Sequence, residues 1–190
     1  MVETTPTLAA ATASLPPEGA QFEPRGGPSA RTTDRVWDAL ADVPDPEVPA
    51  VSIVELGIVR NVSMTDGRVR IEVTPTYSGC PATEMISTMI RERLAAVGLT
   101  DVDLVMTLSP PWTTDWIAPE GKRKLAQFGI APPHAVVNVA GISRIRKATV
   151  PCPRCGSKTT SLLSQFGSTA CKAQYRCDDC REPFDYFKPH

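Results

Sequence analysis

Four of the six cysteines stand in two CxxC pairs near the end of the chain, with a spacing that suits a metal site. The pairs are Cys152 with Cys155 and Cys177 with Cys180, separated by 21 residues. Two intervening residues let both sulfurs of a pair reach one ion, and two facing pairs complete a closed tetrahedral shell of thiolates. This pattern predicts a zinc ribbon whose structural Zn²⁺ holds the fold, with iron–sulfur ligation as the alternative.

Cys80 and Cys171 are left outside these pairs and carry the functional question. Cys80 follows a turn at residues 78–79 and precedes Pro81, a residue favoured in the first turn of a helix. A cysteine at or beside a helix N-cap meets the positive end of the helix dipole, which lowers the thiol pKa. We therefore interpret Cys80 as a nucleophile or a soft-metal ligand, against the alternative of a small buried capping residue.

Composition is that of an ordinary globular protein: 190 residues, 42% hydrophobic and 22% charged, enough for one domain and a small module. The net charge of −1 and the lack of a basic stripe argue against nucleic acid and anionic membranes as partners. The only apolar stretch near the start, Leu8–Leu15, is short and predicts neither a secretory signal nor a membrane span. We expect a cytoplasmic protein, whose thiols stay reduced and bind metal or react.

The elements that position these residues follow from apolar periodicity. Residues 1–31, rich in Ala, Thr and Pro, predict a disordered tail, and a short helix is expected from Thr32 or Thr33 through Ala41. The prolines of residues 44–49 require an extended or turning chain.

Further along, the pair Asp66-Gly67 between apolar runs predicts a hairpin. A helix over 81–97, a strand over 102–106 and a short helix over 119–128 follow. The fold class is therefore α/β (α+β). We expect a small two-layer sandwich over 32–130, a connecting segment over 131–148 and a zinc-ribbon module over 149–190.

Three segments resemble the iron–sulfur assembly domain of SufT-like proteins and cytosolic cluster-targeting factors. They are DPEVP at 45–49, SIVELGIV at 52–59 and TPTYSGCP at 74–81, within a resemblance that covers about residues 33–130. Together with SPPWTTDW at 109–116 and FGSTACK at 166–172, the whole chain after residue 32 resembles the PaaD family of bacterial phenylacetate degradation.

This resemblance implies a role with phenylacetyl-CoA epoxidase, a multicomponent di-iron monooxygenase fed by an iron–sulfur reductase. The chain has no ExxH carboxylate set and no GxGxxG fingerprint, so we do not expect catalysis by this chain alone. The resemblance instead implies a maturation factor that helps to assemble an iron–sulfur or iron site in an oxygenase or reductase subunit. Cys80 would then be the reactive or cluster-handling cysteine, with Asp45 and Glu47 as its partners.

In that mechanism Cys80 transiently ligates iron or a cluster, alone, with Cys171, or with its counterpart in a homodimer. Cys171 could equally exchange with a ribbon ligand or merely line the ribbon. Two other function classes stay open: a noncatalytic structural or regulatory subunit with an inert Cys80, and a thiol-redox protein in which Cys171 resolves Cys80. Trp112 and Trp116 fit either a partner surface or the core, and the acidic residues of 45–47 could simply be solvated.

Overall fold

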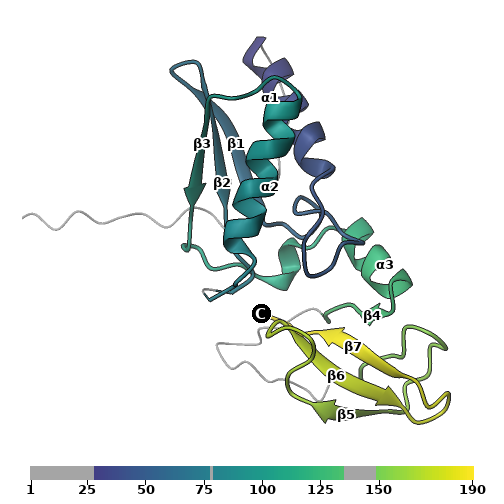
Figure 1. Ribbon diagram of the computed structural model, residues 1–190. Helices are drawn as coiled ribbons and strands as arrows, with labels where there is room; N and C mark the ends of the chain where they lie inside the picture. The colour runs from purple at the N-terminus through teal and green to yellow at the C-terminus, as the bar shows by residue number, and fades with distance from the viewer. Residues whose placement is uncertain (1–27, 78, 135–148) are drawn as a thin grey trace, which may run out of the picture.

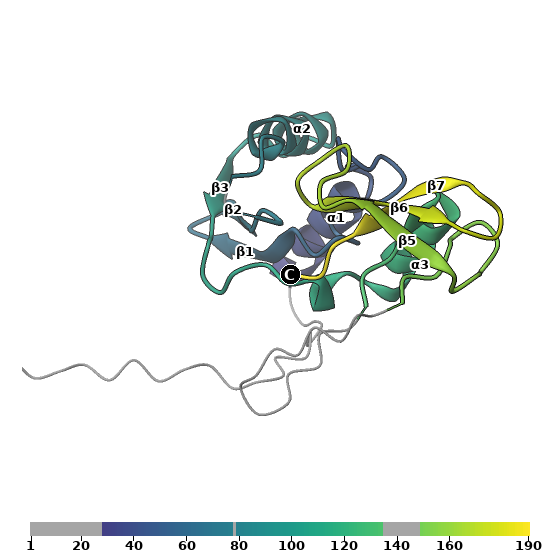
Figure 2. The ribbon, with the colours of Figure 1, turned by 90° about the horizontal axis from the view of Figure 1, so that it is seen from below.

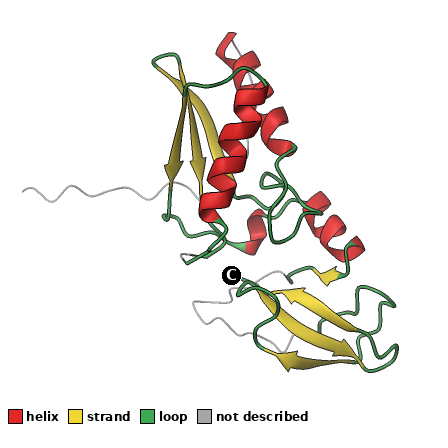
Figure 3. Ribbon diagram, in the orientation of Figure 1, coloured by secondary structure: helices red, strands yellow, loops and turns green. Residues whose placement is uncertain are grey.

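The computed structural model describes residues 28–77, 79–134 and 149–190 (Figure 1). Residues 1–27 of the expected disordered tail and residues 135–148 of the expected connecting segment lie outside this part. The described chain forms a helix-and-sheet unit, here called the α/β unit, and a smaller all-strand unit, here called the ribbon (Figure 3). The predicted α+β class with a C-terminal ribbon is confirmed.

The sheet of the α/β unit contains β1 (Val59–Thr65), β2 (Arg68–Val73) and β3 (Val102–Met106) in the order β1-β2-β3. β1 and β2 form the expected antiparallel hairpin, and β3 runs parallel to β2. Asp66 and Gly67 both have positive φ, 51° and 80°, as a tight hairpin turn requires. Along β2 buried apolar residues alternate with charged ones, so one face of the sheet forms the core and the other is polar.

Helices α1 (Pro28–Ala41) and α2 (Thr83–Ala96) cover the apolar face of this sheet (Figure 2). The expected start of α1 at Thr32 or Thr33 is wrong, because the helix already begins at Pro28, and a proline at the first helical position loses no intrahelical hydrogen bond. The buried stripe of α2 is the one that its periodicity predicts, with a spacing of four residues: Ile86, Ile90 and Leu94.

The ribbon contains β4 (Ile130–Ala131), β5 (Thr160–Ser164), β6 (Lys172–Cys177) and β7 (Pro183–Phe187) in the order β4-β7-β6-β5. Neighbouring strands are antiparallel except β4, which runs parallel to β7. β4 closely follows α3 (Pro119–Gln127), so the end of the α/β unit contributes a short strand to the ribbon sheet. The two units are therefore joined through a common sheet.

The two units also share a hydrophobic core. Phe187, at the end of β7, is 1% exposed and belongs to the core of the α/β unit, where its ring centroid lies 6.0 Å from that of Trp112. Trp112 is itself buried, and its indole Nε1 donates a hydrogen bond to the Leu56 carbonyl oxygen at 3.0 Å. Thr113 Oγ1 donates to the main-chain oxygen of His190 at 2.9 Å. Trp112 thus belongs to the core, and the last residues of the ribbon are fixed against the α/β unit.

The turn that carries Leu56 depends on a glycine. Gly57 has φ +69°, and a Cβ at this position would lie 2.6 Å from the main-chain oxygen of Trp116. A side chain would therefore clash as well as strain the backbone. The short 3-10 helix η1 (Thr114–Trp116) can pack on this turn only because Gly57 has no side chain. Half-buried Trp116 is covered by the Arg60 guanidinium, 3.2 Å from its ring centroid.

Within the described residues, no helix combines the length and the apolar character that crossing a membrane would require.

We expect Phe187→Ala to lower the free energy of unfolding by about 3–5 kcal/mol, because it empties a space in the core that joins the two units. Phe166→Ala, at a ribbon position that is 68% exposed, is the control and should change stability by about 0.5 kcal/mol or less. Urea unfolding of the metal-loaded protein measures both. Equal losses in the two variants would show that the shared core contributes little.

Candidate functional site

The four cysteines of the CxxC pairs meet at one point of the ribbon. Their sulfur atoms all lie within 4.8 Å of one another, with Cys152 Sγ 3.8 Å from Cys180 Sγ and Cys155 Sγ 3.5 Å from Cys177 Sγ. A tetrahedral ion with metal–sulfur bonds of about 2.3 Å places its sulfurs about 3.8 Å apart. The donor set and its spacing therefore fit a tetrathiolate metal site, as the sequence predicts.

Each CxxC pair closes with the same backbone device. The residue after the second cysteine has a left-handed conformation in both pairs, φ 76° at Gly156 and φ 66° at Arg181. In the first pair the Gly156 amide donates to the Cys152 carbonyl oxygen at 2.9 Å, and in the second the Cys180 amide donates to Cys177 Sγ at 3.5 Å. These turns direct both sulfurs of a pair toward the same point.

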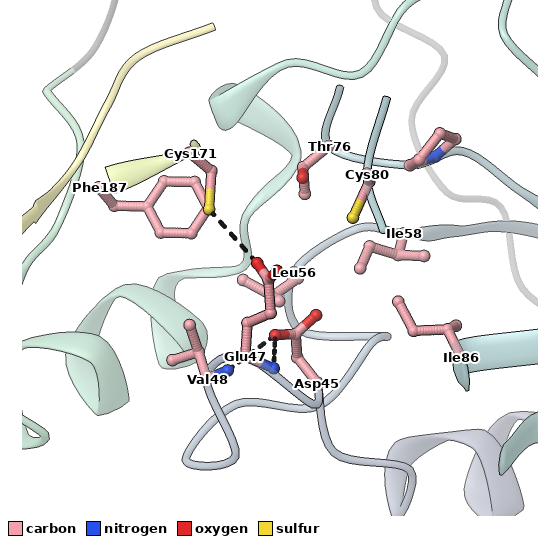
Figure 4. Close-up of a pocket in the computed structure, with 11 residues that line it drawn as sticks. Asp45, Glu47, Val48, Leu56, Ile58, Thr76, Cys80, Ile86, Cys171 and Phe187 are labelled. Carbon is pink, nitrogen blue, oxygen red and sulfur yellow. Dashed lines mark hydrogen bonds between the residues drawn. The ribbon is translucent and has the colours of Figure 1, made fainter. Parts of the chain in front are cut away.

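The remaining predicted site residues all line a second place, a pocket between the two units that we call the thiol pocket (Figure 4). Cys80 comes from the loop before α2, Cys171 from the ribbon loop before β6, and both Asp45 and Glu47 come from the proline-rich turn after α1. The cavity measures about 10 Å³, room for one water molecule. Apolar side chains complete its wall: Val48, Leu56, Ile58, Pro75, Ile86 and Phe187.

Asp45 is a structural part of this pocket as well as a polar group in it. Its side chain is 7% exposed, and Oδ1 accepts hydrogen bonds from the amides of Glu47 at 2.9 Å and Val48 at 2.8 Å. Aspartate commonly stabilises a turn in this way. The alternative of a solvated Asp45 is therefore wrong, and the turn that Asp45 organises directs Glu47 toward the ribbon.

Cys171 is the contact that the ribbon makes with this turn. Its thiol donates to Glu47 Oε2 at 3.8 Å, and Thr169 Oγ1 lies 3.0 Å from the same sulfur. Cys171 is 3% exposed, packs in the core of the α/β unit and is absent from the group of sulfurs in the tetrathiolate site. Cys171 is therefore not part of the tetrathiolate site. It faces Cys80 across the thiol pocket (Figure 4).

The expected activation of Cys80 by a helix N-terminus is wrong. α2 begins at Thr83 with Ala82 as its N-cap, so Cys80 lies outside the helix, in a turn where its amide donates to the Tyr77 carbonyl oxygen at 3.1 Å. Burial raises the pKa of the half-buried thiol, and the negative charges of Glu47 and Asp45 raise it further. The effect of desolvation exceeds that of the amide of Ala82, which favours the thiolate.

The other three groups of the pocket also hold their protons more tightly than usual. Burial raises the pKa of Asp45, and it raises that of Glu47 together with the neighbouring Asp45 charge. Burial is also the main cause that raises the pKa of Cys171, and the nearby negative charge of Glu47 raises it further. A metal cation would reverse this balance, because it stabilises the anionic form of every donor and releases their protons.

The four donors of the thiol pocket are not drawn together into a finished metal site. Among the described residues, the ribbon cysteines are the only group of three or more potential ligands placed closely enough to hold a metal ion. An ion in the thiol pocket would have to bring its ligands closer. Such a site costs reorganisation energy on binding and is suited to weak, reversible ligation.

Sequence reasoning missed Lys172, which is 4% exposed and follows Cys171 directly. Its ammonium lies 3.8 Å from Asp185 Oδ2, and its charge acts on both carboxylates of the pocket. Lysines are rarely buried, so no pattern in the sequence predicts this position. The only sequence feature that could have drawn attention to Lys172 is its position directly after Cys171, a cysteine outside the CxxC pairs.

Two family models match different parts of the chain. The family model described as iron-sulfur cluster assembly protein matches residues 33–107, and the one described as PaaD zinc beta ribbon domain matches residues 140–188. An Escherichia coli protein, provisionally named as the D component of 1,2-phenylacetyl-CoA epoxidase, is 52% identical over 154 residues, covering 80% of this chain and 90% of that protein. The chain belongs to the PaaD family.

Two further comparisons cover about half of the chain or less. The Fe-S protein maturation auxiliary factor SufT of Staphylococcus aureus is 34% identical over 76 residues, which is 39% of this chain and 85% of that protein. A crystal structure of a DUF59 domain from Bacillus anthracis has 25% identity and a TM-score of 0.48, covering 51% of this chain and 93% of that domain. The predicted resemblance to SufT-like assembly domains and to the PaaD family is confirmed.

The raised pKa of Cys80 predicts slow alkylation at neutral pH. The rate of iodoacetamide modification, followed on the Cys80 peptide by mass spectrometry, should still be increasing at pH 9.0, the ordinary thiol value. Glu47→Gln should move the profile to lower pH because it removes a negative charge that opposes the thiolate. Glu92→Gln, on the exposed face of α2, is the control. A midpoint well below pH 8 in the wild type would contradict the account.

Proposed function

We propose that this chain is an accessory maturation factor of a phenylacetyl-CoA epoxidase system, which carries iron transiently to an oxygenase or reductase subunit. One observation supports the proposal most: Asp45, Glu47, Cys80 and Cys171, contributed by two units, all line the thiol pocket. The epoxidase-component name of the Escherichia coli relative and the maturation-factor name of the Staphylococcus aureus relative support the partner and the role.

The chemistry of the pocket favours a single ferrous ion as cargo. Two thiols and two carboxylates offer a mixed sulfur and oxygen shell, whereas iron–sulfur clusters are normally held by four cysteines. A cavity with room for one water molecule accommodates one ion and no preassembled cluster. The raised pKa values of the two thiols favour their protonated form without metal, so iron would displace these protons to bind and be released when they return.

We further propose that the tetrathiolate site holds a structural zinc ion. Its four sulfurs form the closed shell of a structural site, with no position for a substrate. β6 ends at Cys177, so the ion fixes one end of the strand whose other end follows Cys171. In this proposal zinc has no part in the transfer and serves to position Cys171.

A thiol-redox protein is the second candidate, because Cys80 and Cys171 line one pocket. A resolving cysteine must reach the attacked sulfur, and thiolate attack requires a low thiol pKa. Burial raises the pKa of both thiols, and Glu47 accepts a hydrogen bond from Cys171. These features favour metal exchange over disulfide exchange.

A noncatalytic structural or regulatory subunit, in which Cys80 is inert, would have no need for a buried and a half-buried carboxylate beside two thiols. Epoxidase activity in cells distinguishes this alternative, because an inert Cys80 could be replaced without loss.

We expect Cys80→Ser to weaken Fe²⁺ binding by the zinc-loaded protein at least tenfold, since it removes one of two sulfur donors. An anaerobic titration at pH 8 measures the affinity. In cells that depend on this chain for epoxidase activity, the variant should lose most of that activity while zinc content stays at one ion per chain. Thr88→Ser, on the exposed face of α2, is the control. Full activity with Cys80→Ser would refute the iron-carrier role.

Removal of zinc should affect both units. A strong chelator should melt the ribbon and, because Cys171 and Phe187 leave the shared core, also lower the melting temperature of the α/β unit. Circular dichroism during chelation and zinc readdition measures the change. If the melting temperature of the α/β unit is unaffected, the metal of the ribbon does not stabilise the thiol pocket, and the prediction is wrong.

A further inference from the structure

The thiol pocket is too small for a side chain of another protein to enter. Its volume of about 10 Å³ holds one water molecule, so no second donor fits beside a bound ion. Two of its four donors are also closed off from solvent, because Asp45 is 7% exposed and Cys171 is 3% exposed. Iron that passes to a partner must therefore leave past a donor that reaches the surface, and the half-buried Glu47 and Cys80 are the two that do.

A groove on the ribbon lies next to the thiol pocket. Its volume is about 440 Å³, and Glu47 lines both this groove and the pocket. Ligand sites in proteins commonly have volumes of roughly 300–1,000 Å³, so the groove has room for several side chains of a bound protein segment. The other three donors of the pocket do not line the groove. Glu47 is thus the donor that a molecule in the groove would meet first.

The walls of the groove have the composition of a protein interface. The segment after α3 supplies Phe128, which is 56% exposed, and the first CxxC pair supplies the exposed Arg154. Aromatic residues and arginines are enriched where proteins bind one another. An exposed aromatic ring and an exposed guanidinium on the walls of one groove therefore favour a protein segment as its occupant.

The charges of the groove favour an acidic segment. Its two carboxylates already have partners, since Asp185 forms an ion pair with Lys172 at 3.8 Å and Glu47 accepts a hydrogen bond from Cys171. The side chain of Arg154, in contrast, has neither a hydrogen bond nor an ion pair with any other residue of the described structure. A guanidinium pairs most strongly with a carboxylate. The donors that bind iron in a recipient protein are themselves anionic carboxylates or thiolates, so they are complementary to this charge.

We propose that the groove is the docking site for an acidic segment of the protein that receives the iron, and that the transfer begins at Glu47. A carboxylate or thiolate of that segment replaces Glu47 on the ion, and further donors of the segment then replace the buried ones. Iron stays Fe²⁺ throughout. Each bond to a pocket donor that breaks is replaced by a bond to a donor of the segment, and the released thiolates of the pocket take up protons from water. This inference rests on the proposed function, because it names where the partner binds and the chemistry of the segment that accepts the same cargo.

The test follows the capture of iron from the full-length, zinc-loaded protein carrying Fe²⁺, under anaerobic conditions at pH 8. Two chelators stand in for the partner, the anionic ferrozine and the neutral bipyridine. Arg154→Gln should slow capture by ferrozine by about fivefold or more and capture by bipyridine by less than about twofold, because the guanidinium attracts only the anionic chelator. Arg91→Gln, at an exposed arginine of α2 that lines neither cavity, is the matched control.

A second variant obstructs the groove without touching the pocket. Gln174 is exposed on β6 and lines the groove, so Gln174→Trp should slow capture by both chelators by about fivefold and leave the Kd for Fe²⁺ within about twofold of the wild type. Gln165→Trp, at an exposed ribbon glutamine that lines neither cavity, is its matched control. Zinc content and circular dichroism confirm that each variant is folded, and the Arg154→Gln result decides the matter if Gln174→Trp does not fold.

The outcomes separate this inference from the proposed function. Absence of iron binding by the wild type would refute the carrier role itself. Iron that binds but is captured equally fast from the wild type, Arg154→Gln and Gln174→Trp leaves by another path, such as past Cys80, and would overturn only the docking site. A capture rate independent of chelator concentration would also overturn the docking site, since the iron would then depart before its acceptor arrives. Slower capture by ferrozine alone in Arg154→Gln, and by both chelators in Gln174→Trp, would support it.

Discussion

The packing of the ribbon against the α/β unit is the constraint on which the rest of the structure depends. Phe187 packs beside Trp112 in the core of the α/β unit, and Cys171 belongs to the same core. Neither unit alone contains both thiols of the thiol pocket, because Cys80 belongs to one and Cys171 to the other. β6 connects this contact to the tetrathiolate site, since the strand begins directly after Cys171 and ends at Cys177.

The chemistry of the pocket follows from burying several acidic groups in a small volume. Desolvation disfavours the charge of each thiol and carboxylate, so the proposed iron cargo would have to compete with the protons of the pocket. Under the proposed carrier role this competition would keep iron binding weak, and a partner with a more complete ligand set could remove the ion.

Much of this arrangement could be predicted from local patterns. The CxxC spacing gives the tetrathiolate site, and Asp66-Gly67 gives the hairpin, because both depend on a few adjacent residues. Local patterns misplace the helix start near Cys80, since Pro81 suits a helical first turn as well as it suits the turn observed. The approach of Cys171 to Glu47, 124 residues away, and the burial of Lys172 arise from the packing of two units, which no single-sequence pattern encodes.

X-ray absorption at the iron edge of the zinc-loaded protein carrying one Fe²⁺ tests the central claim most directly, because it counts the atoms bound to the cargo. Two sulfur neighbours with oxygen neighbours beside them are expected, from Cys80, Cys171 and the carboxylates of Asp45 and Glu47. Four sulfur neighbours would place the iron in the tetrathiolate site of the ribbon. A shell of oxygen and nitrogen alone would show that the thiol pocket does not hold it, and either result would contradict the account.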